Sequence, residues 1–110
     1  MFKVARDKDR RIIGVNWSVY IILCTDSTFY TGITKNIDRR LLQHAGQGGA
    51  KYFRGRQPKY VVYLERGHSR SSASRREIAI KKMRRKEKCL LILSDRNEVE
   101  LPEATFGLIG

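Results

Sequence analysis

The chain has 110 residues, with 23 lysines and arginines against 11 aspartates and glutamates, and therefore a formal net charge of +12. This length allows one domain with one small core, burying roughly two-thirds of the surface that the unfolded chain exposes. A hydrophobic content of 41% excludes a fully disordered polyelectrolyte. The charge predicts a polyanionic partner, and the interleaving of basic and aromatic residues favours nucleic acid over an acidic membrane surface or an acidic protein.

The cysteine pattern and the lengths of the apolar runs predict the compartment. Cys24 and Cys89 are isolated, with no C-x-x-C spacing and no nearby histidine pair, so we expect reduced thiols and no disulfide-linked partner. No signal peptide is recognised, and the longest apolar runs are far too short to span a membrane. We therefore expect a soluble, cytoplasmic protein without a membrane partner.

The N-terminal part of the chain predicts a β-hairpin. Residues 1–16 alternate charged with few apolar side chains and fit either a basic arm or a marginal strand. Residues 17–24 are β-branched and aromatic without a polar break, as in a strand covered on both faces. Turn residues at 25–27 lead into a second β-prone run at 28–31. The hairpin would set the tyrosines of the two runs, Tyr20 and Tyr30, on paired strands.

An amphipathic helix is predicted directly after this hairpin. Gly32 ends the β-prone run and permits a tight or positive-φ turn. Asn36 is a plausible N-cap, and apolar residues recur at helical spacing from Ile37 onwards. Arg40 and His44 lie four apart and would share one face of the helix.

Reactive groups converge at this point of the chain. The face that carries Arg40 and His44 would lie next to the phenol of Tyr30, so a guanidinium, an imidazole and a phenol could surround one phosphate. The same residues also fit an ordinary structural turn, and this alternative stays open.

Residues 46–58 combine four glycines, three basic residues and two aromatics, which predicts a flexible cationic loop. Glycines allow a close approach to a sugar–phosphate backbone, guanidinium and ammonium groups bind phosphate, and aromatic rings stack on bases. A solvated loop without this role is the alternative. The predicted nucleic-acid contacts, in the loop and beside it, are Lys35, Arg39, Lys51, Tyr52, Arg54, Arg56 and Lys81.

The second half of the chain predicts a strand and two helices. Residues 60–64 form the strand, and serines at 69–74 offer N-caps for a helix, including a capping box from Ser74 to Glu77. Glu77 lies near the apolar stripe of this helix and four residues before Lys81, so it could point inward. The stripe consists of Ala73, Ile80 and Met83.

A basic run at 84–88 leads into residues 89–93, predicted as a last helix that packs its apolar side on the sheet. The tail adds further apolar residues to the edge of the core, namely Leu101, Phe106 and Leu108. The expected organisation is an arm or marginal strand at 1–16, a domain at 17–93 and a C-terminal tail at 94–110.

These elements and residues resemble the GIY-YIG nuclease superfamily from Trp17 to about Leu93. The first signature resembles Ser18-Val19-Tyr20 and the second resembles Tyr30-Thr31-Gly32, and the segment from Gly49 to Pro58 resembles small standalone bacterial members related to the catalytic domain of the excinuclease C subunit. The departures are Ser18 and Val19 for glycine and isoleucine, Thr31 for the middle isoleucine, and Ile33 where some relatives carry lysine.

The resemblance implies an α+β fold, a three-stranded antiparallel sheet flanked by three or more helices. It implies a metal-dependent endonuclease that hydrolyses DNA, duplex or branched, with a role in DNA repair. The family's helix arginine falls on Arg40 and its metal-binding glutamate on Glu77, which would hold a single Mg²⁺ or Mn²⁺. The implied catalytic residues are Tyr20, Tyr30, Arg40, His44 and Glu77, and the general base is Tyr20, Tyr30 or His44.

Two other classes of function stay open at this point. A basic nucleic-acid-binding module could keep the fold without catalysis, with the same residues merely packing and pairing. An adaptor for an acidic protein would bind a carboxylate-rich partner and no DNA.

Overall fold

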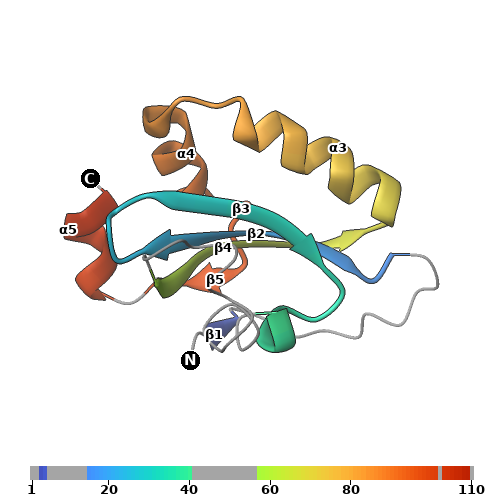
Figure 1. Ribbon diagram of the computed structural model, residues 1–110, viewed down its shortest axis with the longest axis horizontal. Coiled ribbons are helices and arrows are strands. Elements are labelled where there is room, and N and C mark those ends of the chain that lie inside the picture. The colour runs from blue at the N-terminus through green and yellow to red at the C-terminus, as the bar shows by residue number, and fades with distance from the viewer. Residues whose placement is uncertain (1–2, 5–14, 41–56, 102, 110) are drawn as a thin grey trace.

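The computed structural model describes residues 3–4, 15–40, 57–101 and 103–109. A three-stranded antiparallel sheet in the order β3-β2-β4 lies at the centre (Figure 1). Its strands are β2 (Trp17–Cys24), β3 (Phe29–Thr34) and β4 (Pro58–His68). The β-branched run of β2 occupies the middle position because it is buried on both faces.

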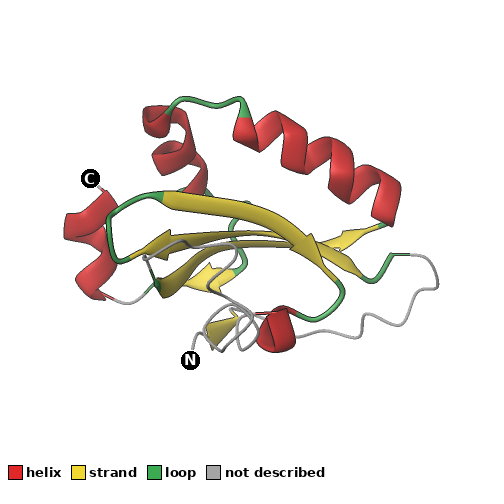
Figure 2. Cartoon of the chain, viewed as in Figure 1, coloured by secondary structure: helices red, strands yellow, loops and turns green. Residues whose placement is uncertain are grey.

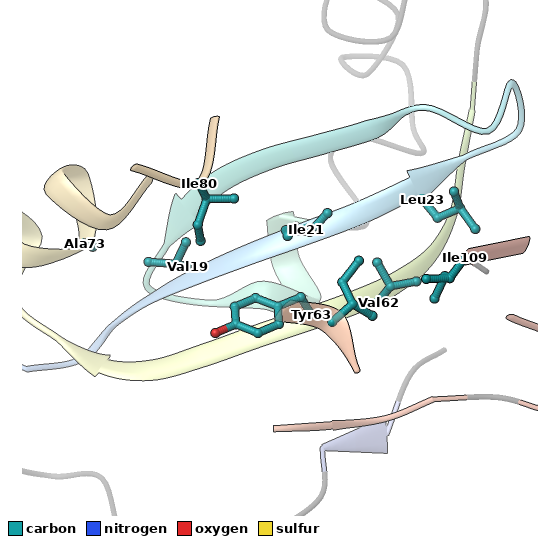
Figure 3. Close-up of a cluster of buried hydrophobic side chains, with 9 residues drawn as sticks. Val19, Ile21, Leu23, Val62, Tyr63, Ala73, Ile80 and Ile109 are labelled. Carbon is teal, nitrogen blue, oxygen red and sulfur yellow. The ribbon is translucent and has the colours of Figure 1, made fainter. Parts of the chain in front are cut away.

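Two helices cover one face of this sheet (Figure 2). They are α3 (Arg70–Lys81) and α4 (Arg85–Ile92). The core on this side includes Val19 and Ile21 of β2 with Ala73 and Ile80 of α3 (Figure 3). The predicted inward stripe of the helix is therefore confirmed at Ala73 and Ile80.

The opposite face of the sheet has its own buried cluster, which includes Tyr20, Ile22 and Leu64. A helical turn at residues 37–40 lies on this side, and Ile37 packs against the cluster. A second sheet of two short strands, β1 (Lys3–Val4) and β5 (Val99–Glu100), lies on the same side as that turn (Figure 1). The predicted fold class, an α+β domain with a three-stranded antiparallel sheet and flanking helices, is confirmed.

Asn97 ties the segment after α4 to the rest of the fold. Its Nδ2 donates to the carbonyls of Val62 (2.7 Å) and Ile92 (2.8 Å), and its Oδ1 accepts from the amides of Leu64 (3.2 Å) and Val99 (3.0 Å). One side chain therefore joins β4, α4 and β5.

The tail ends in the 3₁₀ turn η2 (Glu103–Thr105) and the helix α5 (Phe106–Ile109). The helix predicted at residues 89–93 is present as the end of α4, but it is not the last helix, because α5 follows it. Ile109 enters the core, whereas Phe106 stays half exposed, because α5 turns that position to solvent. Cys89 and Cys24 are both free thiols, as predicted.

Two local predictions need correction. No turn occurs at Gly32, because β3 continues through it to Thr34, and its φ is not positive. The cap of α3 is Ser69 rather than Ser74: Ser69 Oγ accepts from the amide of Ser72 (3.0 Å), whose side chain in turn accepts from the amide of Ser69. No helix in the described part of the chain is long and apolar enough to cross a bilayer.

Candidate active site and nucleic-acid interface

Two tyrosines lie together on one face of the sheet. Their ring centroids are 6.3 Å apart and their planes are inclined by 38°. Tyr20 pairs with Gly32 across β2 and β3, and Tyr30 lies two residues before that glycine on the same face. A Cβ at Gly32 would lie 2.5 Å from the hydroxyl oxygen of Tyr20. The glycine is therefore needed so that the Tyr20 phenol can pass over β3, which is an edge strand.

Arg40 lies at the end of the same strand, in the helical turn at residues 37–40. The predicted N-cap is confirmed, since Asn36 Oδ1 accepts from the amide of Arg39 (3.0 Å) and the Asn36 carbonyl accepts from the amide of Arg40 (3.0 Å). Arg40 lines an open hollow of about 250 Å³. The other lining residues are Trp17, Thr34, Lys35, Asn36 and Arg39.

Glu77 lies on α3 beside its buried stripe. Its side chain is 21% exposed, and Oε2 lies 3.1 Å from the Nζ of Lys81, the pairing expected from their spacing. The preceding residue, Arg76, reaches Glu65 on β4. Because successive residues are rotated by about 100° around a helix, Arg76 and Glu77 lie on the two sides of the buried stripe formed by Ala73 and Ile80. The helix α3 itself packs against β3, β2 and β4.

The predicted catalytic residues therefore do not lie in one basin on one face. Tyr20 and Tyr30 lie on the side of the helical turn that carries Arg40, whereas α3 and Glu77 cover the other side. Both groups lie along β3, whose outer edge is not paired with another described strand. His44 and the loop residues Lys51, Tyr52, Arg54 and Arg56 lie outside the described residues.

A buried polar network between β4 and α3 was not predicted. Glu65 is 8% exposed and accepts from Tyr63 Oη (2.5 Å) and from Arg76 Nε (3.1 and 3.2 Å). His68 Nε2 lies 2.7 Å from the same carboxylate, and its Nδ1 lies 2.8 Å from Ser72 Oγ. The network thus fastens α3 to β4 through a carboxylate, a phenol, an imidazole and a guanidinium.

The network shifts the pKa of its members. Burial would raise the pKa of Glu65, but the hydrogen bonds from Tyr63, His68 and Arg76 and the charge of Arg76 outweigh it, so the pKa is lowered. Burial and the adjacent carboxylate raise the pKa of Tyr63 well above its ordinary value. Glu65 is therefore a carboxylate and Tyr63 a neutral phenol at neutral pH. A signal existed in the sequence: Glu65 is a charged residue inside a run that is otherwise typical of a buried strand.

The metal hypothesis rests on one carboxylate. Across residues 3–4, 15–40, 57–101 and 103–109, no three His, Cys, Asp or Glu side chains gather as a metal site. A single carboxylate suits Mg²⁺ or Mn²⁺, which keep several waters and take further oxygens from a phosphate. The Thr31 hydroxyl, buried and without a hydrogen-bond partner, belongs to β3 opposite Ile21, on the α3 side of the sheet. The oxygen donors among the described residues thus fit a largely hydrated hard cation.

The fold carries the tyrosine pair on β2 and β3 and Arg40 after them, the features on which the resemblance to the GIY-YIG nucleases rests. A family model described as the GIY-YIG catalytic domain matches residues 16–89, and the chain belongs to this family. This membership places the chain in a nuclease superfamily, whose substrates are nucleic acids and whose members generally use a divalent metal ion.

Several small proteins of this family are similar to the chain. A UPF0213 protein of Desulfotalea psychrophila is 52% identical over 68 residues, 61% of this chain and 62% of that protein. A UPF0213 protein of Clostridium perfringens is 45% identical over 90 residues, 82% of this chain and 97% of that protein. The solution NMR structure of a UPF0213 protein from Bacillus halodurans is 39% identical, covers 73% of this chain and 85% of its own, and superposes with a TM-score of 0.48.

Proposed function

We propose that this protein is a metal-dependent endonuclease that hydrolyses DNA phosphodiester bonds at a site built around the edge of β3. The observation that carries the proposal is the arrangement along this one strand. The Tyr20 phenol crosses it at Gly32, Arg40 lines the hollow at its end, and α3, which bears Glu77, packs against it. The outer edge of β3, with which no other described strand pairs, is where a nucleic-acid backbone would lie.

Each group has a distinct role in this proposal. Arg40 holds the scissile phosphate, because a planar and permanently charged guanidinium binds two of its oxygens at once. Glu77 would hold the metal ion, and a bound divalent ion would supply Lewis-acid chemistry at the phosphate. Tyr20 or Tyr30 in its phenolate form, or His44 as the alternative base, would take the proton of the attacking water. The water oxygen then bonds to phosphorus while the bond from phosphorus to the leaving oxygen breaks.

The assay is nicking of supercoiled plasmid with and without Mg²⁺ or Mn²⁺. Glu77→Gln and Arg40→Ala should each lower the rate about 10²- to 10³-fold, as expected when a group that stabilises transition-state charge is lost. Asp95→Asn and Arg96→Ala make the same charge changes at exposed positions after α4 and should leave the rate unchanged. The proposal requires both results together: nicking that depends on the metal ion, and loss of nicking in Glu77→Gln and Arg40→Ala but not in the two control variants.

Nicking that survives Glu77→Gln, or that needs no metal, would refute the catalytic proposal. Persistent DNA binding without any nicking would instead support the second function, a basic binding module on the same fold. This alternative is favoured by the placement of Glu77 and the tyrosines on opposite sides of the sheet. If the protein binds no DNA at all, the adaptor for an acidic protein is the remaining function. The resemblance to the excinuclease C catalytic domain separately supports a role in DNA repair.

A further inference from the structure

Trp17, the first residue of β2, is placed where an aromatic ring can meet a ligand. It packs against the core cluster on the α3 side but stays partly exposed. Two cations from different elements approach its ring: Arg70 Cζ lies 5.5 Å and Lys35 Nζ 5.6 Å from the ring centroid. The ring also forms one wall of the hollow that Arg40 lines.

The hollow has the chemistry of a nucleotide site. Its described lining contains one aromatic ring, two neutral polar residues and three cationic residues, and none of them is acidic. With Arg70 at the ring, four cationic side chains either line the hollow or lie over its indole. Its volume of about 250 Å³ lies below the roughly 300 Å³ at which pockets for larger organic ligands begin. Stacking on an aromatic ring beside cations is how proteins hold the bases of unpaired strands.

The hollow shares Arg40 with the proposed catalytic site. Arg70 and Glu77 lie on the same flank of α3, because seven residues make almost two full helical turns. They are about 10 Å apart along the helix axis, which is within reach of neighbouring phosphates on one strand. Arg40 lines the hollow from the other side of the sheet.

We propose that this hollow binds one unpaired nucleotide, with its base stacked on Trp17 and its phosphate held by Arg39 and Arg40. The faces of a base inside a duplex are covered by its neighbours, so the strand must be single at this position. The substrate class is therefore a nucleic acid with an unpaired stretch next to the cleaved bond. This inference rests on the proposed nuclease function for its place in catalysis, but the binding step can be measured without cleavage.

The chain offers a direct probe, because Trp17 is its only tryptophan. A short oligothymidylate, titrated without metal ion, should quench the Trp17 fluorescence saturably, whereas a blunt-ended duplex of equal length should not. Affinities of variants are measured separately by anisotropy of the labelled oligonucleotides. Trp17→Leu should weaken oligothymidylate binding about 5- to 150-fold, the range for loss of one stacked base, while Trp17→Phe should retain most of the affinity.

Phe29→Leu is the matched control. Phe29 packs partly buried against the same core cluster and also has a cation over its ring, with Arg85 Cζ at 4.3 Å, but it does not line the hollow. Replacing Phe29 by leucine should leave the affinities for oligothymidylate and for the duplex unchanged. Thermal melting checks that each variant folds, and the quenching titration of the parent protein still tests the subsite if Trp17→Leu does not fold.

Equal quenching by duplex and oligothymidylate, or no quenching by either, would overturn the subsite. So would a loss of affinity on Trp17→Leu that is the same for both nucleic acids. Nicking of plasmid without selective quenching would refute the subsite and leave the proposed function intact. Selective quenching in a protein that cuts nothing would support the subsite and refute the proposed function.

Discussion

Replacing Gly32 by alanine tests how the tyrosine pair is built. A Cβ at this position would lie 2.5 Å from Oη, 2.7 Å from Cζ and 3.2 Å from Cε2 of Tyr20. Ordinary van der Waals contact begins near 3.4 Å, so the phenol would have to move by about 1 Å. Tyr20 is 1% exposed and packs in the cluster with Ile22 and Leu64, which leaves little room for that movement.

The expected cost is that of overpacking a well-filled core, about 1–3 kcal/mol. For a domain of this size, each kcal/mol lowers the melting midpoint by about 4–6 °C. Calorimetry of Gly32→Ala should therefore show a midpoint reduced by roughly 5–15 °C. Gly107→Ala is the control, because a Cβ at Gly107 meets nothing within 4 Å; its midpoint should be unchanged or slightly higher.

A double-mutant cycle isolates the contact. Tyr20→Leu removes Oη and Cζ, so adding Gly32→Ala to that variant should cost much less than in the parent protein. If Gly32→Ala lowers the melting midpoint equally in the parent protein and in Tyr20→Leu, the steric contact with Tyr20 is refuted. A melting midpoint of Gly32→Ala equal to that of the parent protein would refute it as well. If the phenol also acts in catalysis, Gly32→Ala should slow nicking at temperatures where the variant is fully folded.

Three further predictions follow from the polar side chains of the fold. Asn97→Ala removes four hydrogen bonds that join β4, α4 and β5. Urea denaturation should show that it lowers the unfolding free energy by about 2–4 kcal/mol. The neighbouring variant Arg96→Ala should stay within about 0.5 kcal/mol of the parent protein. Because its pKa is lowered in the folded state, ionised Glu65 stabilises the fold at pH values above the ordinary carboxyl pKa, and this stability is lost as the pH falls through the lowered folded-state value. The melting temperature of Glu65→Gln should therefore fall less steeply in acid than that of the parent protein. An acid profile equal to that of the parent would contradict the network. The affinity for duplex DNA should fall with salt, and each neutralised phosphate should contribute about −0.9 to the slope of log affinity against log salt concentration. Arg39→Ala should reduce the magnitude of that slope by about one unit. An affinity that does not depend on salt would exclude nucleic acid as the partner.

Much of the fold could be predicted from local patterns. The buried run at 17–24, the strand around 60–64 and the apolar stripe at Ala73 and Ile80 all express a period that a strand or a helix imposes on its own residues. The signature spacing around Tyr20 and Tyr30 likewise identified the family. These features depend on neighbours in the chain, so the sequence alone determined them.

Contacts between distant segments were decided by the tertiary structure. Glu65 became part of a network because α3 brings Arg76 back onto β4, and Gly32 is required because Tyr20 crosses it from the neighbouring strand. The side of the sheet on which Glu77 lies depends on the packing of α3 across β3 and β2, which no periodicity encodes. Such contacts join residues 11 or more positions apart, and only the closing of the sheet and its helices into one core selects which of them form.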